Sequence, residues 1–359
     1  MNPEQPSTPS VSMTPMSPMP PRSTARSSKS MTPKTRKKII LYSCLGILVA
    51  ICLVAAYYIH AFYSFADTVY DNSKPAATMD TAPIGGGGGG GGESLPIPEP
   101  PDWDGEERVN ILLLGGDSRG VKSTVHPRSD TMMIVSIDPV DKTIHLFSLL
   151  RDSYVPIPNY SSNRINTAIT LGGPRLAMTT VSDLVDLPIH YYVYTDFEGF
   201  ISLIDALGGI DFDVDKAMHR VDTADDPRYN IHLEAGMQHL DGLSALQYMR
   251  FRSDGRSDFG RSDRQRKLLS AIADEMKKVT SLIRLPQVLN SIAPYIETDI
   301  SPGDLFDLAR LGLKLDTSSI VSLQLPQSGA FQEANIRGMD VLVVDEAKIR
   351  SYVKEQLAL

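Results

Sequence analysis

Six arginines and no lysine stand within the stretch from Gln247 to Arg266, near the middle of the chain. A guanidinium group presents a rigid fork of donors that binds a phosphate through two hydrogen bonds, whereas lysine offers a point charge. The stretch therefore suits a bound phosphate. Three aspartates interleave with the arginines, so a solvated loop with internal Arg–Asp pairs explains the same composition equally well. The arginines are Arg250, Arg252, Arg256, Arg261, Arg264 and Arg266.

Two aspartates could hold a metal ion beside such a phosphate. Asp117 follows an apolar run at 109–114 that predicts a buried strand and ends in two glycines. Asp130 begins the next predicted strand, so both carboxylates reach one edge of the sheet if the two strands are antiparallel neighbours. Carboxylate oxygens are ligands that Mg²⁺ prefers. For Asp117 taken alone, an aspartate that caps a turn is the simpler interpretation.

A third polar pair, Arg151 and Asp152, comes directly after the strand predicted at 143–149. It could lie at the same edge, and the alternative is an exposed ion pair of little energetic worth. The sequence contains no P-loop and no G-x-S-x-G motif, and no cluster of His and Cys predicts a zinc site. Surface or core roles are predicted for three scattered histidines, which are His219, His232 and His239.

An alternating acidic run, Asp211, Asp213 and Asp215, resembles the start of a calcium loop. The EF-hand pattern requires Gly at its sixth place and Glu at its twelfth. This chain has Lys216 and Asp222 there, so the run is interpreted as the solvated face of a strand.

Predicted strands and helices alternate along residues 109–359. This alternation predicts an α/β fold, a layered α/β/α domain around a central mixed sheet, and no break divides it. The predicted strands are 109–114, 131–137, 143–149, 190–195, 210–214 and 319–325. The predicted helices are 166–171, a segment from Pro174, 197–207, 241–250, 265–279, and segments that begin at Ser301 and Asp345.

Three further segments are predicted before this domain. Residues 1–38 are rich in Pro, Ser, Thr and Met, with seven bases and one acid, which predicts a disordered basic tail. Residues 39–59 carry no charge and form about 30 Å of helix, one bilayer core, so a transmembrane helix is predicted. Residues 60–107 contain eight consecutive glycines and several prolines, which predict a linker to an extracytoplasmic domain at 108–359. Both cysteines of the chain lie in the predicted span.

The distribution of charge predicts the orientation. Basic residues precede the apolar span, and the next one after it is Lys74, so the positive-inside rule places the N-terminus in the cytoplasm. A cleaved signal peptide is the alternative, but the basic lead-in and the apolar run are too long for one. The net charge of the whole chain is −8 and that of residues 1–38 is +6, so the remaining residues carry a net charge of −14. A general nucleic-acid surface is therefore not expected around the arginines.

Six short motifs occur along the chain in a fixed order. They are NILLLGGDSR at 110–119, RSDT at 128–131, SLLRD at 148–152, RIN at 164–166, YMRFR at 248–252 and DFGRSDRQ at 258–265. Each motif alone is a weak signal, but together and in this order they resemble the LytR-CpsA-Psr family. The resemblance covers about residues 108–280 and is looser beyond them.

The resemblance implies a fold and an activity. Members of the family hold a polyprenyl chain in an apolar channel of an α/β fold. They attach a glycopolymer from a polyprenyl-pyrophosphate-linked donor to cell-wall peptidoglycan. A muramic acid 6-hydroxyl is the implied acceptor, a phosphodiester is the product, and polyprenyl phosphate leaves. The implied enzyme is a membrane-anchored phosphotransferase that depends on Mg²⁺ or Mn²⁺.

The resemblance also implies roles by position. Asp117 and Asp130 would hold the metal ion. The residues that would bind the pyrophosphate are Arg128, Arg151, Arg250, Arg252, Arg261 and Gln265. Asp152 is our first choice as general base and Asp258 our second, since both lie among arginines that keep a carboxylate ionised. Arg151, next to Asp152, would take part in catalysis as well.

Two other classes of function stay open. Family members have also been described as regulators or attenuators of transcription, but the predicted topology puts the arginines outside, and no helix-turn-helix pattern is present. The second class is a polyprenyl-pyrophosphate phosphatase or lipid-binding module, because the sequence does not distinguish water from a sugar hydroxyl as the nucleophile. The expected partners are the lipid-linked donor, peptidoglycan and the cell membrane, and no nucleic acid.

Overall fold

The computed structural model describes residues 33–73, 96–117, 126–221, 226–251, 257–316 and 320–359. The chain divides into two compact units, Met1–Val54 and Ala55–Leu359, and the second unit holds the α/β domain. Most of the predicted basic tail and the glycine run of the predicted linker lie outside the described residues.

The helix α1 (Pro33–Ser73) contains the predicted membrane span at 39–59. Its segment Leu45–Tyr70 is long and apolar enough to cross a membrane, judged by length and composition. The described residues thus contain one such helix, as expected for a single-pass protein.

The predicted start of the linker at His60 is wrong, because α1 continues to Ser73. Ala61, Phe65 and Val69 recur every four residues, so they share one face of the helix. All three are buried, and Phe65 and Val69 belong to a hydrophobic core cluster of the second unit. Packing of this face explains why the helix does not end with the uncharged run.

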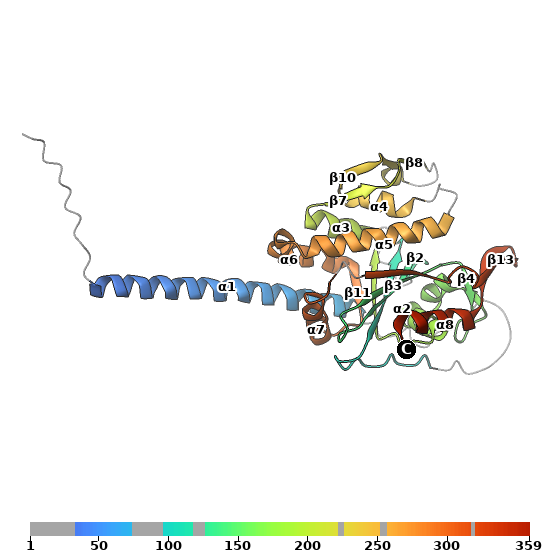
Figure 1. Ribbon diagram of the computed structural model, residues 1–359, viewed down its shortest axis with the longest axis horizontal. Coiled ribbons are helices and arrows are strands. Elements are labelled where there is room, and N and C mark those ends of the chain that lie inside the picture. Colours follow the sequence, from blue (N-terminus) through green and yellow to red (C-terminus); the bar gives the residue numbers. More distant parts are fainter. Residues whose placement is uncertain (1–32, 74–95, 118–125, 222–225, 252–256, 317–319) are drawn as a thin grey trace, which may run out of the picture. The chain divides into compact units, whose positions relative to one another are not determined.

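Six strands form the central sheet, in the order β11-β6-β1-β2-β3-β12 (Figure 1). They are β1 (Val109–Gly116), β2 (Ser129–Ile137), β3 (Ile144–Leu149), β6 (Tyr191–Asp196), β11 (Ile296–Thr298) and β12 (Ile320–Leu325). β1 pairs antiparallel with β2 and parallel with β6, while β3 pairs antiparallel with β2 and parallel with β12. The sheet is therefore mixed, which confirms the predicted fold class.

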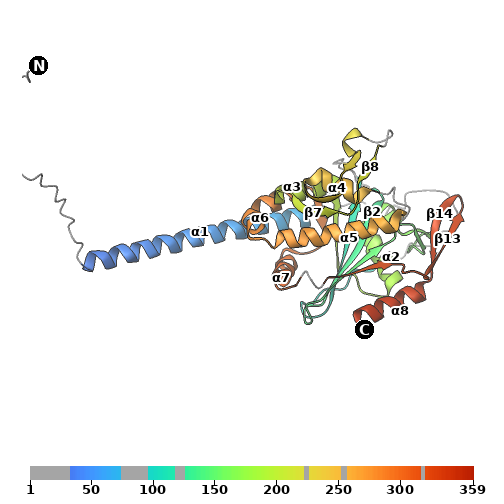
Figure 2. The same cartoon turned by 45° about the horizontal axis from the view of Figure 1, so that its top comes forward.

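Helices cover both faces of this sheet, as Figures 1 and 2 show. One face packs against α2 (Ala168–Val185) and α8 (Glu346–Leu357), whose buried side chains share a core cluster with the strands. The other face carries four helices around a second cluster. These are α3 (Phe197–Leu207), α4 (Gly242–Arg250), α5 (Ser257–Met276) and α6 (Val279–Ile292). The three layers are those predicted, and α7 (Pro302–Gly312) packs beside them.

Short strands outside the central sheet form smaller ribbons. β7 (Ile210–Val214) pairs with β10 (Gly236–Leu240), and β8 (Met218–Arg220) pairs with β9 (Ile231–Leu233). A four-stranded sheet contains β4 (Ser153–Val155), β5 (Asn163–Arg164), β13 (Phe331–Ile336) and β14 (Met339–Val344). Three 3-10 turns, at Ile165–Thr167, Pro227–Tyr229 and Ala293–Tyr295, complete the described elements. The alternation of exposed Asp211 and Asp213 with buried neighbours on β7 confirms a solvated strand face.

The described parts of the arginine stretch are largely helical, since 247–250 belong to α4 and 257–266 to α5. α4 ends at Arg250 and begins at the cap Asp241, whose carboxylate accepts a hydrogen bond from Ser244 N, as predicted. α5 begins at Ser257, well before the predicted start at Gln265. A buried face explains the earlier start, since side chains three and four residues apart lie on one side of a helix. The buried residues on this face of α5 are Arg261, Arg264, Gln265 and Leu268.

Candidate active site

The polar residues predicted from strand ends come from one edge of the central sheet. Gly116 at the end of β1 pairs with Ser129 at the start of β2 and also lies beside the end of β6. β3 ends on the same side, because it runs antiparallel to β2. Asp117, Asp130 and Arg151 therefore follow or begin strands at a common edge. The antiparallel pairing on which this prediction depended is confirmed.

A pocket of about 170 Å³ opens at this edge. It is lined by Asp130, Thr131, Arg151, Phe197, Arg220, Tyr229, Ile231, Met249, Arg250, Arg261 and Gln265. The lining thus contains four arginines and one carboxylate, although the chain as a whole is acidic. A local excess of positive charge in a concave site favours an anionic ligand.

Asp130 connects two arginines that come from different elements. Arg151, which follows β3, donates a hydrogen bond from Nη1 to Asp130 Oδ1. Nη1 of Arg261 on α5 lies 4.0 Å from the same oxygen, and Arg261 is only 5% exposed. A buried guanidinium requires a nearby negative charge, because desolvation of the cation is costly. Asp130 therefore keeps two cations together in the wall of the pocket.

Arg250, the last residue of α4, lies against two aromatic rings that also contact each other. Its guanidinium carbon is 5.1 Å from the ring centre of Phe197 and 5.0 Å from that of Tyr229. Such cation–π contacts hold the guanidinium group at the aromatic part of the pocket wall. Burial raises the pKa of the Tyr229 phenol and the nearby Glu198 carboxylate raises it further, so this ring stays neutral.

Gln265 lies one helical turn after Arg261 on α5, so both side chains face the pocket. Its Nε2 donates a hydrogen bond of 2.8 Å to Oγ1 of Thr131. This contact ties α5 to the start of β2, next to Asp130. Gln265 is therefore placed both to fix the wall and to contact a ligand.

Asp152, the first choice for a general base, does not line the pocket in the described part of the chain. Its Oδ2 lies 3.6 Å from Nε of Arg151, and its Oδ1 lies 3.3 Å from Nε of Arg164. Asp152 thus stands beside the pocket and contacts it through Arg151.

The remaining predicted residues lie around the pocket or outside the described residues. Asp117 is half-buried after β1, and its negative charge contributes to the raised pKa of Tyr229. Arg128 is exposed directly before β2. Asp258 belongs to the first turn of α5, but its side chain lies outside the description, as does the whole of Arg252.

Six lining residues were not among the predicted site residues. Thr131 and Met249 belong to the motifs quoted above, whereas the other four, Phe197, Arg220, Tyr229 and Ile231, lie outside every motif. Phe197 follows the carboxyl end of β6, a position where ligands of α/β sheets gather, so that rule could have found it. Arg220 and Ile231 are paired across the β8–β9 ribbon, and Tyr229 precedes β9. No pattern in the sequence indicates that this ribbon reaches the central sheet.

Comparison with known proteins defines the class. The model of the LytR_cpsA_psr family matches residues 91–358, and the chain belongs to this family. The match confirms the resemblance carried by the six motifs. It also extends past residue 280, where the motifs become sparse.

Individual relatives carry two kinds of name. Regulatory protein MsrR of Staphylococcus aureus is 31% identical over 232 residues, which cover 64% of this chain and 67% of MsrR. Polyisoprenyl-teichoic acid–peptidoglycan teichoic acid transferase TagU of Bacillus mycoides is 30% identical over 295 residues, or 82% of this chain and 89% of TagU. The crystal structure of TagV from Bacillus subtilis matches with a TM-score of 0.59 at 27% identity, over 70% of this chain and 98% of that one.

Proposed function

We propose that this protein is a membrane-anchored transferase that attaches a glycopolymer to peptidoglycan. The donor is a glycan linked to a polyprenyl pyrophosphate, the product is a phosphodiester, and polyprenyl phosphate is released. The observation that carries the proposal is the basic pocket at the sheet edge, with four arginines in its lining. The name of TagU, a polyisoprenyl-teichoic acid–peptidoglycan teichoic acid transferase, supports the same donor and acceptor classes.

The arginines supply what phosphoryl transfer needs most, which is positioning and neutralisation of charge. Arg151 and Arg261 share Asp130 and approach from two elements, while Arg250 is oriented by two rings. We assign these three guanidinium groups to the pyrophosphate of the donor, together with Gln265. Arg128, which is exposed directly before β2, and Arg252, which lies outside the described residues, would complete the binding site.

Asp117 and Asp130 would hold a divalent cation, Mg²⁺ or Mn²⁺. Their oxygens fit such an ion, because Mg²⁺ binds to one or two carboxylates and takes its other ligands from water and phosphate. When bound, the ion adds positive charge at the phosphate oxygens. Asp130 also contacts Arg151 and Arg261, so it orients the arginines around the same phosphates.

The acceptor hydroxyl needs a base, and Asp152 stays our first candidate. Arg151 and Arg164 flank its carboxylate and hold it at the sheet edge. Asp258 is the second candidate, because it belongs to the first turn of α5, the helix that carries Arg261. Either residue would take the proton from a muramic acid 6-hydroxyl as the oxygen attacks phosphorus.

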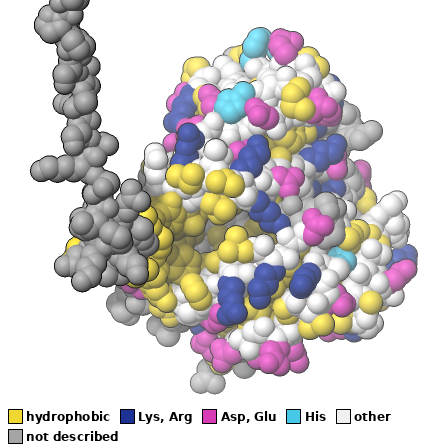
Figure 3. All heavy atoms as spheres, turned by 60° about the vertical axis from the view of Figure 1, so that its left-hand side comes forward, with side chains coloured by type: hydrophobic (Ala, Val, Ile, Leu, Met, Phe, Trp, Pro, Cys, Tyr) yellow, Lys and Arg dark blue, Asp and Glu magenta, His cyan; other side chains and the backbone are white. Residues whose placement is uncertain are grey.

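A lipid-linked donor explains the anchor, because enzyme and donor then share one membrane surface. We propose that the N-terminus is cytoplasmic and that the domain lies outside, in accord with the basic residues before α1. Figure 3 shows hydrophobic side chains on the same face as several basic ones, and exposed apolar side chains of α6 and α7 include Leu282, Ile283 and Phe306. These features support an apolar site for the polyprenyl chain.

MsrR carries the name of a regulator, which keeps a regulatory function as the second candidate. An effect on gene expression would then follow from a change in the cell envelope, without contact to nucleic acid. A phosphatase that uses water as nucleophile would be served by the same pocket.

Donor turnover by the purified full-length chain separates these functions. The chain is reconstituted in nanodiscs with a polyprenyl-pyrophosphate-linked oligosaccharide and Mg²⁺, and release of polyprenyl phosphate is measured with and without peptidoglycan fragments. We expect release to require the acceptor and to fall in Asp117→Ala and Asp130→Ala, but not in Asp141→Ala, an exposed aspartate of the turn after β2. Release that is independent of acceptor would instead indicate a phosphatase. Undiminished metal-dependent release in both site variants would exclude the metal assignment.

A further inference from the structure

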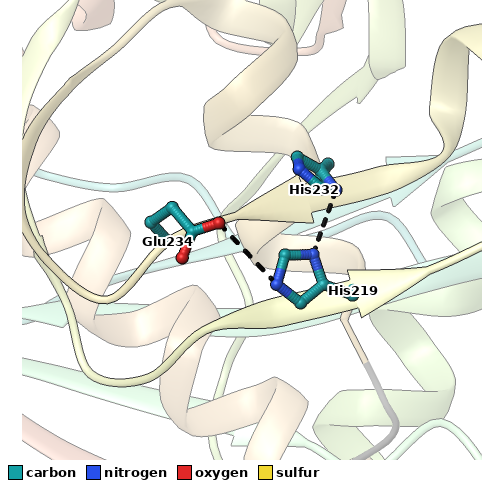
Figure 4. A group of neighbouring side chains, drawn as sticks. All are labelled: His219, His232 and Glu234. Atoms are coloured by element: carbon teal, nitrogen blue, oxygen red, sulfur yellow. Dashed lines mark hydrogen bonds and ion pairs between the residues drawn. The ribbon is translucent and has the colours of Figure 1, made fainter.

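Two histidines form a pair across the β8–β9 ribbon, outside the pocket lining. His219 of β8 and His232 of β9 are directly opposite in the antiparallel register. Both side chains are exposed, whereas the next pair along, Met218 and Leu233, is buried. Alternate residues of a strand face opposite sides, so the histidines stand together on the outer face of the ribbon. Figure 4 shows the two rings with Glu234 beside them.

The geometry of the pair is close to that of two ligands on one metal ion. Nδ1 of His219 lies 3.0 Å from Nδ1 of His232. Two nitrogens that bind one tetrahedral Zn²⁺ at about 2.0–2.1 Å are about 3.3–3.4 Å apart, so a small opening of the pair would admit the ion. Such an ion would replace the hydrogen that the two nitrogens now share.

Glu234 is the candidate for a third ligand. Its Oε1 now lies 3.9 Å from Nε2 of His219, the ring nitrogen turned away from His232, and one donor atom from each of the three residues lies within 4.8 Å of the others. The Glu234 side chain is 75% exposed, so a change of rotamer, rather than a repacked core, is what brings its carboxylate to an ion held between the two Nδ1 atoms. Two imidazoles and one carboxylate are a common donor set for Zn²⁺, while Mg²⁺ and Ca²⁺ prefer oxygen ligands alone.

We propose that His219, His232 and Glu234 bind a transition-metal ion, with Zn²⁺ as the best fit, which cross-links β8 to β9. The next rung of the ribbon is Arg220 and Ile231, and both line the pocket. A metal ion on the histidine rung would therefore fix the strands that carry this part of the pocket wall. The effect on the pocket rests on the proposed function, whereas binding of the metal does not.

Binding is measured by calorimetry on untagged full-length chain in nanodiscs, with ZnCl₂ as the probe and excess Mg²⁺ present to occupy carboxylate sites. We expect one Zn²⁺ per chain. Removal of a residue that only orients a metal ligand weakens metal binding by about 10–100-fold. Removal of a ligand itself should cost at least as much, so His219→Gln and His232→Gln should each weaken Zn²⁺ binding by at least about tenfold. Glu234→Gln should weaken it as well. His239→Gln is the matched control, because this exposed histidine pairs with Asp211 outside the cluster.

Hydrogen exchange gives a second readout that does not depend on activity. Zn²⁺ should slow amide exchange in β8 and β9 of the parent and of His239→Gln, but not of His219→Gln. Melting without metal checks that the variants are folded. Equal Zn²⁺ affinity in the parent, His219→Gln and His232→Gln would overturn the proposal, as would the absence of a one-to-one site. If Zn²⁺ binds as expected but donor turnover fails, only the proposed function is contradicted.

Discussion

Substitution of Arg261 by lysine should weaken donor turnover strongly while leaving the fold intact. Lysine keeps the positive charge, so the change removes only the planar fork of donors. Arg261 is 5% exposed, lines the pocket and lies 4.0 Å from the carboxylate of Asp130. Asp130 keeps its hydrogen bond to Arg151 in the variant, so its charge stays compensated.

The magnitude follows from the contact that is lost. A hydrogen bond to a charged group contributes about 1.5–3 kcal/mol. Since 1.4 kcal/mol corresponds to a factor of ten, loss of one contact to a phosphate oxygen should lower kcat/KM by roughly 10- to 100-fold. If the contact is equally strong before and during transfer, the loss appears in KM; if it strengthens during transfer, kcat falls.

The assay is donor turnover in nanodiscs, with melting as the check on folding. Arg350→Lys is the matched control: Arg350 lies on α8, on the other face of the sheet, and donates to Glu346 Oε2 at 2.8 Å and to Asp183 O at 2.7 Å. Arg350→Lys also replaces a helical guanidinium group by an ammonium group, so any loss of stability that comes from this exchange alone would appear in both variants. If Arg261→Lys and Arg350→Lys turn over donor like the parent, Arg261 does not bind the pyrophosphate by its fork, and the site must be sought elsewhere.

Three further predictions concern stability, pH and topology. Gly242→Ala would place a Cβ 2.4 Å from the carbonyl oxygen of Ile201, so the free energy of unfolding should fall by about 1–3 kcal/mol. Gly312→Ala is the control: a Cβ at this position has no atom within 4 Å, so Tm should stay almost unchanged. Burial raises the pKa of Asp299 from 3.8 to about 6, so the folded state favours the protonated carboxyl, and this stabilisation is lost as pH rises through 6. Asp299→Asn cannot ionise, so its free energy of unfolding, measured by chemical denaturation, should rise relative to that of the parent by about 1–2 kcal/mol between about pH 4 and 7.5. A difference that stays constant with pH would exclude this linkage. External protease on spheroplasts should cut within residues 85–92 and release the domain, and full protection would reverse the orientation.

Much of the fold was predictable because its signals are local. The apolar run before Asp117, the cap at Asp241 and the helix at 197–207 are each set by neighbouring residues, and the structure has them as expected. The common sheet edge of Asp130 and Arg151 was predicted from one assumption, that the first two strands of the domain are antiparallel neighbours, and β1 and β2 are paired in this way.

The errors arose where tertiary packing decides. The start of α5 at Ser257 and the extension of α1 to Ser73 both depend on buried faces whose partners lie far away in sequence. Arg220 enters the pocket lining, and His219 meets His232, only because β8 and β9 pair across a connection with no periodic signal. A scattered set of histidines therefore gave no indication of a cluster.

The central claim, that glycan is transferred to peptidoglycan rather than released, is tested most directly by the mass of the product. Purified full-length chain is incubated with lipid-linked donor, Mg²⁺ and peptidoglycan, and the peptidoglycan is then digested and analysed by mass spectrometry. We predict a muropeptide whose mass is increased by the glycan plus one phosphodiester phosphate, with an equal amount of polyprenyl phosphate. Glycan phosphate free in solution, with unmodified muropeptides, would contradict the claim.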